Sequence, residues 1–419
     1  MSERIEAPRG TQDVLGELAA GLHGVEQAAR RILEPAGYRR IETPTFEDTA
    51  LFARGVGEST DIVQKEMYTF DDGGGRSITL RPEGTAPVCR AYLEHGMQKQ
   101  PQPVRLWYLS SFYRYERPQA GRYRQFWQIG IEAIGSAEPE VDAEAIVLLR
   151  TLLDELGARG LRLRISSLGT PQARAAYREE LQAHLRAHAA RLSDEVRARI
   201  DSNPLRAFDS DHPGTREVMA GAPLLLDRLD GEDREHFAAV RALLDAADVA
   251  YDVDPTLVRG LDYYTRTVFE YASDALGAQS GVGGGGRYDG LIELLGGPAT
   301  PGVGWASGVE RILLASGGGH DAPPAVDLFV AFEPARRRDA FALVAHARQA
   351  GRAAQMELAG RSLKGQLKQA SRTGARFVAV LREDASVLQD TETREEVPVS
   401  GDGDAIVAAV LRNLGTGSL

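Results

Sequence analysis

The residues whose types and spacing most clearly suggest chemistry lie in one arginine-rich segment, FYRYERPQAGRYRQFWQIGIEAIG (112–135). Residues 105–124 hold five arginines that are opposed by one acid, Glu116. If residues 122–132 are extended, alternate side chains share a face. One face then carries an aromatic ring, an amide, a gap and a carboxylate, from Phe126, Gln128, Gly130 and Glu132. Trp127, Ile129 and Ile131 pack behind it.

With Arg114 and Arg122 at its entrance, this face predicts a pocket for an anionic, ring-bearing ligand beside a cationic or N–H-donating one. A solvated hairpin with a half-buried strand gives the same pattern, so both interpretations stay open. Four of the 49 basic residues are lysines and the other 45 are arginines, so an isolated arginine is weak evidence for an anion site.

A second segment with candidate side chains is LVRGLDYYTRTVFE (257–270). Arg259 stands beside Gly260, where the backbone can turn tightly. Tyr263 and Tyr264 are adjacent, so in an extended segment their hydroxyls would lie on opposite faces. Two core tyrosines next to an exposed arginine are the alternative interpretation.

Two helix starts also carry candidates. SGVE (307–310) fits a capping box with Ser307 at the N-cap. Arg311 then lies in the first helical turn, where a cation is unfavourable unless an anion is nearby, although a plain surface arginine is equally consistent. In RPEGT (81–85), Glu83 and Thr85 stand at the mouth of the next helix, and a helix cap is the favoured interpretation.

The elements that must position these residues follow from hydrophobic periodicity. Helices are expected at 18–36, 85–95 and 308–315, and strands at 38–43, 67–70, 77–81, 104–108, 123–134 and 265–271. Residues 170–248 are rich in Ala, Arg and Glu and predict a mostly helical insertion. The glycine run GVGGGGRYDG (281–290) is assigned to no element.

A linker, ASGGGHDAPPA (315–325), precedes a second region with strand-like VDLFVAF, RFVAVL and EEVPVS and helices at about 336–350, 361–373 and 403–414. This alternation predicts a small, separate α/β domain. Residues 335–382 hold eleven basic and two acidic side chains, whereas the whole chain has a net charge of -11. Such a local reversal suits contact with a nucleic-acid backbone, or a solvated helix face.

Several classes of protein are excluded. The chain has no Walker A sequence, no Cys/His cluster with zinc spacing and no run of apolar residues long enough to span a membrane. Its one cysteine, Cys89, permits no internal disulfide, which favours a reducing compartment, and no apolar leader follows Met1. We expect a cytoplasmic protein with no membrane attachment and no protein-bound metal site.

Taken together, the segments resemble the class II aminoacyl-tRNA synthetases, and within them the histidyl-tRNA synthetase family. The helix and strand ending at Pro44 resemble the first class motif, FYRYERPQAGRYRQF the second and GVGWASGVERI the third. LVRGLDYYTRTVFE, GGGGRYDGL and RPEGT resemble segments typical of the histidine branch, and GRSLKGQLKQASRTGARFV resembles its anticodon-binding domain.

The resemblance implies an α+β catalytic core at 1–320, with a six-stranded antiparallel sheet and the helical insertion at 170–248, and an anticodon-binding α/β domain at 326–419. It implies ligation of histidine to tRNA-His through a histidyl-adenylate, with ATP and Mg²⁺, by a homodimer. The implied site residues are Arg259 and Arg114 in catalysis; Glu83, Gly84, Thr85, Gln128, Glu132, Tyr263 and Tyr264 for histidine; Arg114, Glu116, Arg122, Phe126 and Arg311 for ATP; and Arg117 and Gln119 for the tRNA acceptor end.

Two alternatives resemble the same segments. A synthetase-like regulatory subunit of ATP phosphoribosyltransferase usually lacks the anticodon domain and degrades the LVRGLDYY segment, both of which are present here. A synthetase for another amino acid of the subclass is not expected to place Glu132, Arg259 and Tyr264 together.

Overall fold

The computed structural model describes residues 5–57, 60–118, 121–277, 280–317 and 326–399, with residues 406 and 408. The chain divides into two compact units, Met1–His320 and Asp321–Leu419. Within the described residues, no helix is both long enough and apolar enough to cross a membrane.

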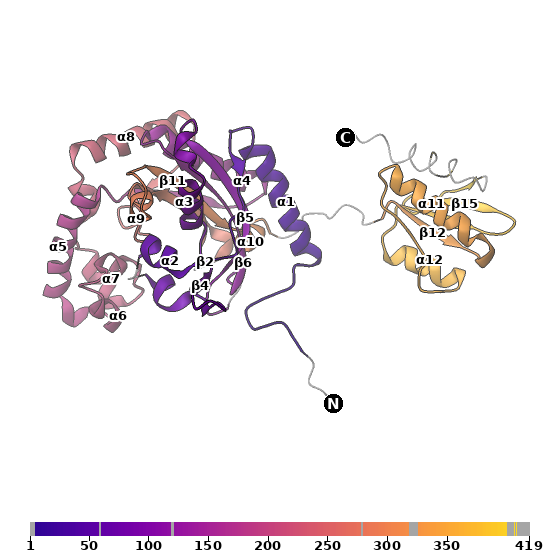
Figure 1. Ribbon diagram of the computed structural model, residues 1–419, viewed down its shortest axis with the longest axis horizontal. Helices are drawn as coiled ribbons and strands as arrows, with labels where there is room; N and C mark the ends of the chain where they lie inside the picture. Colours follow the sequence, from indigo (N-terminus) through magenta and orange to yellow (C-terminus); the bar gives the residue numbers. More distant parts are fainter. Residues whose placement is uncertain are drawn as a thin grey trace. The chain divides into compact units, whose positions relative to one another are not determined.

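The larger unit is built on an eight-stranded sheet with the order β1-β5-β6-β11-β10-β9-β7-β8 (Figure 1). Its six inner strands are all antiparallel to their neighbours, and a two-residue strand is paired in parallel at each edge. The strands are β1 Arg39–Arg40, β5 Val104–Tyr113, β6 Gln125–Ile134, β7 Leu161–Ser167, β8 Asp252–Val253, β9 Thr265–Ser273, β10 Gly281–Arg287 and β11 Gly302–Gly308. The predicted six-stranded antiparallel core is confirmed.

The larger unit also has a three-stranded sheet, in which the hydrogen-bonded order of the strands is β2-β4-β3. It comprises β2 Phe46–Asp48, β3 Thr69–Asp71 and β4 Ser77–Leu80, so the predicted hairpin at 67–81 is confirmed. The glycine run, by contrast, is a central strand, β10, which the sequence did not predict.

Helices cover the two faces of the large sheet. They are α1 Gly16–Leu33, α2 Thr49–Val56, α3 Thr85–Glu94, α4 Pro139–Glu155, α5 Pro171–Ala187, α6 Asp194–Ala198, α7 Pro213–Met219, α8 Gly231–Ala246, α9 Leu291–Leu294 and α10 Val309–Ala315. On one face α1, α4, α8 and α10 bury a core with Ile129 and Ile131 of β6. On the other face, α3 and α9 pack around a second core with Tyr108 and Phe112 of β5.

The insertion at 170–248 is helical, as expected, and α5, α6 and α7 form the outer edge of the larger unit (Figure 1). Its last helix does not stand apart from the core of the larger unit, however. Phe237, Val240 and Leu244 of α8 belong to the main core behind the sheet, because α8 packs directly on α4.

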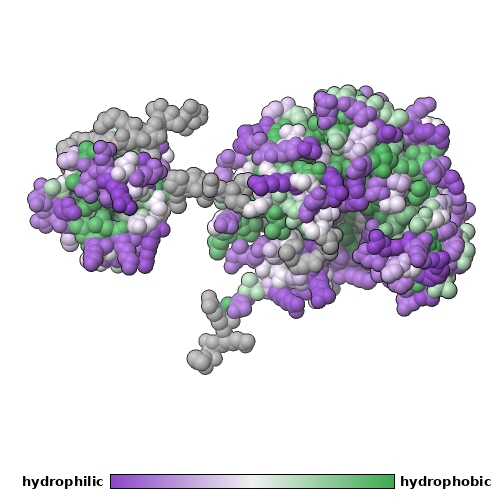
Figure 2. Space-filling view, turned by 180° about the vertical axis from the view of Figure 1, so that it is seen from behind, coloured by the Kyte–Doolittle hydropathy of each residue, from purple (hydrophilic) through white to green (hydrophobic). Residues whose placement is uncertain are grey.

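The smaller unit has a five-stranded mixed sheet in the order β13-β12-β14-β15-β16. Its elements are β12 Leu328–Phe332, α11 Arg337–Gln349, β13 Ala354–Met356, α12 Leu363–Arg372, β14 Phe377–Leu381, β15 Ser386–Asp390 and β16 Glu396–Val399. Hydrophilic side chains gather at its lower end, where α12 runs (Figures 1 and 2). The linker residues 318–325 and most of the helix expected at 403–414 lie outside the described residues.

Candidate active site

Two cavities open on the α3 side of the central strands. The larger measures about 630 Å³ and is bordered by Arg114, Glu116, Arg122, Phe126, Gln128, Arg259, Glu270, Glu310 and Arg311, among others. The smaller measures about 210 Å³ and is bordered by Glu83, Gly84, Thr85, Tyr108, Gln128, Tyr263, Tyr264 and Tyr288, among others. Arg114, Gln128 and Arg259 border both cavities, so the two lie side by side.

Strand β6 supplies the common wall of this site. The predicted alternation is confirmed: Ile129 and Ile131 are fully buried behind the sheet, whereas Phe126 and Gln128 face the cavities. The alternation arises because successive side chains of a strand point to opposite faces. The Arg114 guanidinium lies over the Phe126 ring, 5.5 Å from its centroid.

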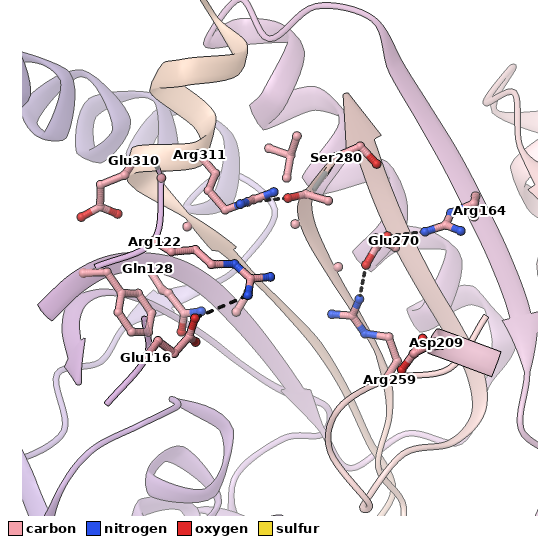
Figure 3. Close-up of a pocket in the computed structure, with 18 of the residues that line it drawn as sticks. Glu116, Arg122, Gln128, Arg164, Asp209, Arg259, Glu270, Ser280, Glu310 and Arg311 are labelled. Atoms are coloured by element: carbon pink, nitrogen blue, oxygen red, sulfur yellow. Dashed lines mark hydrogen bonds and ion pairs between the residues drawn. The ribbon is translucent and has the colours of Figure 1, made fainter. Parts of the chain in front are cut away.

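Cations enter the larger cavity from two sides (Figure 3). Arg122 lies 3.5 Å from the Glu116 carboxylate, and Arg311 donates from Nε to the Gly281 carbonyl at 2.5 Å. Arg259 approaches from the other side, where it is paired with Glu270. Burial lowers the pKa of Arg311, so its environment favours neutralisation of the charge by an anion.

The predicted capping box at the start of α10, beside Arg311, is wrong. Gly308, not Ser307, is the N-cap of α10, and no side chain caps the helix there. Ser307 Oγ instead donates to the Val282 carbonyl at 3.0 Å, which ties β11 to β10. The Glu310 carboxylate accepts the Trp127 N–H at 3.0 Å, and burial raises its pKa to about 7.

Behind the lining of the smaller cavity lies a buried carboxyl group, Glu132, which does not itself border the cavity. It has no exposed surface, and its two oxygens accept from Thr85 Oγ1 at 2.7 Å and from the Tyr288 hydroxyl at 2.5 Å. Burial raises its pKa to about 8, against the opposing effect of those two hydrogen bonds. Both donors border the cavity, so Glu132 is linked to it through the hydroxyl groups of Thr85 and Tyr288.

Glycines make room for this arrangement. A Cβ on Gly304 would lie 2.0 Å from Glu132 Oε2, and one on Gly130 would lie 2.4 Å from the Tyr108 hydroxyl. The gap that the sequence placed at Gly130 is therefore filled by a tyrosine from the neighbouring strand, since Tyr108 pairs with Gly130 in the β5–β6 register. The Tyr108 hydroxyl is buried with no hydrogen-bond partner among the described residues.

At the mouth of α3, both interpretations of RPEGT apply. Glu83 accepts the N–H groups of Thr85 and Ala86 at 2.7 and 2.9 Å, which confirms the helix cap, and it also borders the smaller cavity. Burial raises its pKa. The Tyr263 hydroxyl lies 3.5 Å from the same carboxylate.

The prediction for the tyrosine pair is wrong in geometry. Tyr263 and Tyr264 lie in a turn before β9, with ring centroids 4.8 Å apart, and both border the smaller cavity. Because the backbone is not extended there, adjacent side chains can share a side. Of the expected acceptor-end residues, Arg117 is exposed and borders neither cavity, and Gln119 lies outside the described residues.

The sequence did not single out Tyr108, Tyr288, Glu270 or Arg164. The signal for Tyr108 is the register of β5 and β6, which places it opposite Gly130. Tyr288 directly follows the glycine run, whose strand character was missed.

Comparisons with known proteins agree with this geometry. A family model described as histidyl-tRNA synthetase matches residues 10–312. The chain is 46% identical to the histidine–tRNA ligase of Desulfitobacterium hafniense, over 94% of this chain and 95% of that one. It is 50% identical to that of Halorhodospira halophila, over 91% and 90% respectively.

Among solved structures, the apo histidyl-tRNA synthetase of S. aureus superposes with a TM-score of 0.81 at 37% identity, over 97% of this chain and 100% of that one. An ATP phosphoribosyltransferase regulatory subunit/histidyl-tRNA synthetase from Bacillus halodurans matches at 22% identity with a TM-score of 0.63, over 91% and 98%, a likeness of fold alone. The chain belongs to the histidyl-tRNA synthetase family.

Proposed function

We propose that this protein ligates histidine to tRNA-His in two steps: histidine and ATP form a histidyl-adenylate and pyrophosphate, and the histidyl group then passes to tRNA. The observation that carries the proposal is that Arg114, Gln128 and Arg259 border both cavities. A carboxylate bound in the smaller cavity and a triphosphate bound in the larger one would meet at these side chains.

The larger cavity is assigned to ATP. Phe126 would stack on the adenine, and Arg114 would hold the α-phosphate. Arg122 and Arg311 would hold the terminal phosphates. Glu116, which is paired with Arg122, would orient the Arg122 guanidinium. Planar guanidinium groups suit phosphate oxygens because they donate two parallel hydrogen bonds.

The smaller cavity is assigned to histidine. Glu83, Thr85 and Gln128 would bind the amino group, and Gly84, which borders the same cavity, leaves room for the Tyr108 ring, because a Cβ there would lie 2.5 Å from Tyr108 Cζ. Glu132 and Tyr264 would engage the two imidazole nitrogens, and Tyr263 would support Glu83.

Specificity follows from stranded polar groups. A site built to hydrogen-bond a substrate rejects analogues that lack the matching groups by about 10⁴–10⁵, because its own buried groups are left unpaired. The buried Glu132 carboxyl and its two hydroxyl donors constitute such a site.

Adenylation joins two anions, so the protein's task is to align them and to neutralise developing charge. The attacking histidine carboxylate is already a nucleophile and needs no general base. Arg259, at the junction, is assigned as the group that neutralises charge between the carboxylate and the α-phosphate.

Mg²⁺ is proposed to accompany ATP. No group of three or more metal-ligating side chains occurs among the described residues, which suits an ion held mainly by substrate phosphates with one or two carboxylates. Bound in that way, it would neutralise phosphate charge.

We assign catalysis to residues 1–320 and anticodon recognition to residues 326–419. In the second unit, Lys364, Lys368 and Arg372 stand four residues apart on α12, are exposed, and form no ion pair within the described part of the chain. Arg117 and Gln119 are assigned to the tRNA acceptor end. We further propose a cytoplasmic homodimer whose contact involves the helix and strand before Pro44, which light scattering of the purified protein would test.

The decisive experiment is ATP–pyrophosphate exchange with each of the twenty amino acids in turn. We expect exchange with histidine alone and a fall in kcat of about 10²–10³ in Arg259→Ala, the range for removal of one transition-state donor. Arg162→Ala, an exposed arginine on β7, is the matched control and should retain full activity. Absence of histidine-dependent exchange from folded protein would refute the proposal.

The tail assignment has its own test. The double variant Lys364→Gln/Lys368→Gln should raise the KM for tRNA about tenfold and flatten its salt dependence, because phosphate contacts release counterions. Histidine-dependent exchange without tRNA should be unchanged. An unchanged KM for tRNA would contradict the assignment of this face.

A further inference from the structure

A carboxylate that the proposed chemistry does not use stands in the wall of the larger cavity. Glu270, on β9, accepts from Arg259 NH1 through Oε2 at 2.7 Å and from Arg164 NH2 through Oε1 at 2.5 Å (Figure 3). Arg164 also donates from NH1 to Asp254 Oδ2 at 3.1 Å. Four alternating charges thus form one row, of which Arg164, Glu270 and Arg259 border the larger cavity, and Arg259, at one end, borders the smaller cavity as well.

The position of Glu270 is unfavourable for phosphate binding by itself. A negative charge beside a cavity that receives a triphosphate repels the ligand, and the repulsion is stronger where water is partly excluded. Glu270 is 21% exposed, so solvent screens it only in part. A function for this carboxylate must therefore come from what it does to its partners.

Its clearest effect is on Arg259. Within the described residues, Glu270 is the acceptor to which Arg259 donates, and Arg259 Nε is buried with no partner. The backbone leaves space for the guanidinium, since a Cβ on Gly284 would lie 3.2 Å from Arg259 NH1. One end of the guanidinium is thus fixed on Glu270, while Nε keeps a donor in reserve.

We propose that Glu270 is a positioning residue for adenylation: it holds the Arg259 guanidinium at the junction of the two cavities, with Arg164 fixing the second carboxylate oxygen. The inference rests on the proposed role of Arg259. Glu270 itself touches neither substrate in this scheme, and the repulsion it exerts on ATP is offset by the alignment it gives to Arg259.

The alternative is a purely structural tie between β7 and β9. Those strands are already joined by an antiparallel ladder that pairs Arg164 with Glu270. A second arginine–acid pair lies at the end of these strands: Arg162 of β7 contacts Asp274, the residue directly after β9, and their side chains are 64% and 65% exposed. That pair ties the strands but borders neither cavity, so it provides the matched control.

The first test compares Glu270→Gln with Asp274→Asn in histidine-dependent ATP–pyrophosphate exchange. In Glu270→Gln we expect kcat to fall about 10- to 100-fold, because a slight misplacement of a reacting group costs up to about that factor. The KM for ATP should stay the same or fall, because a negative charge leaves the cavity wall. Asp274→Asn should match the parent protein in both constants. Glu270→Asp, which keeps the charge, should recover part of kcat.

A rise in the KM for ATP with an unchanged kcat in Glu270→Gln would overturn the inference. Equal effects of Glu270→Gln and Asp274→Asn on kcat would also overturn it. Melting followed by tryptophan fluorescence checks folding, because all three tryptophans, Trp107, Trp127 and Trp305, lie in the larger unit. A Glu270→Gln variant that melts earlier but keeps kcat supports the structural alternative and refutes positioning.

The second test is the double variant Arg259→Ala/Glu270→Gln. If Glu270 acts through Arg259, the double variant should have the kcat of Arg259→Ala alone, since residues in one network are not additive. Multiplied losses would overturn the inference. The failures are separable: an active Arg259→Ala refutes the proposed role of Arg259, whereas an impaired Arg259→Ala beside a fully active Glu270→Gln refutes only the role of Glu270.

Discussion

The two neighbouring cavities are lined by different kinds of side chain. The larger is bordered by arginines whose side chains are partly open to solvent, with Arg122 45% exposed. The smaller is bordered by tyrosines and by Glu83, which is 4% exposed, and the fully buried Glu132 lies behind Thr85 and Tyr288 of its wall. A charged side chain near water costs little free energy, because water still solvates it. Recognition by hydrogen bonds becomes strict only where a group left without a partner cannot bind water instead.

The difference teaches where affinity and specificity are expected to arise. Partly exposed arginines in the larger cavity should contribute modest, graded and salt-sensitive binding. The buried groups of the smaller cavity should contribute large, all-or-none discrimination, because removing one of them strands its partners. Substitutions in the two walls should therefore separate the constants for ATP from those for histidine.

The largest effect is expected from Glu132→Gln. The amide of Gln has one acceptor oxygen, whereas the Glu132 carboxyl group has two, which already accept from Thr85 and Tyr288, so the amide cannot reproduce these bonds and one to an imidazole nitrogen. Leaving a buried polar group without its partner costs about 1–3 kcal/mol, so kcat/KM for histidine should fall about 10- to 100-fold.

Steady-state exchange kinetics measure this effect, and the KM for ATP should not change. Glu144→Gln is the matched control, because Glu144 contacts Tyr38 and Arg105 and borders neither cavity. A parallel rise in the KM for ATP would break the comparison, since it would mean that the two cavities respond as one.

A smaller effect is expected from Arg311→Gln in the other wall. The substitution removes one partly screened cation near the terminal phosphates, so the KM for ATP should rise about tenfold, the equivalent of about 1.4 kcal/mol. The KM for histidine should not change. Raising the salt concentration should narrow the gap between variant and parent, and a salt-independent gap would contradict an electrostatic origin.

Part of this site could be predicted from sequence, and the reason is the local nature of the signal. The face of β6 follows from a period of two, which depends only on the strand itself. The helix cap at Glu83 is likewise local, because donor and acceptor are two or three residues apart. The separate second unit follows from the order of its elements, whereas the antiparallel core was implied by the family resemblance.

The remainder depends on contacts that no local pattern encodes. Ser307 bonds across to β10 rather than to its own helix, because a neighbouring strand offers a carbonyl. The strand β10 needs glycine because neighbouring strands occupy the space that side chains would take: a Cβ on Gly285 would lie 1.9 Å from the Gly304 carbonyl oxygen. Glu270 gains meaning only from the register that places Arg164 beside it.

The last prediction concerns the dependence of stability on pH, and it sharpens the comparison through two carboxyl groups. Burial raises the folded-state pKa of Glu132 to about 8 and that of Glu310, in the larger cavity, to about 7, from an ordinary value of 4.5. Above pH 4.5 the unfolded chain loses a proton that the folded protein keeps, so unfolding becomes easier as pH rises. That loss ends near pH 8 for Glu132 and near pH 7 for Glu310.

Glutamine at either position abolishes the titration, so each variant should gain stability relative to the parent protein as pH rises from 5. For Glu310→Gln the gain should level off near pH 7, and for Glu132→Gln it should continue to about pH 8. Urea unfolding of the larger unit, followed by tryptophan fluorescence at pH 5, 6, 7, 8 and 9, measures both curves. Because histidine is proposed to contact Glu132 and not Glu310, saturating histidine should change the first curve and leave the second in place; identical responses would remove the physical distinction between the two cavities.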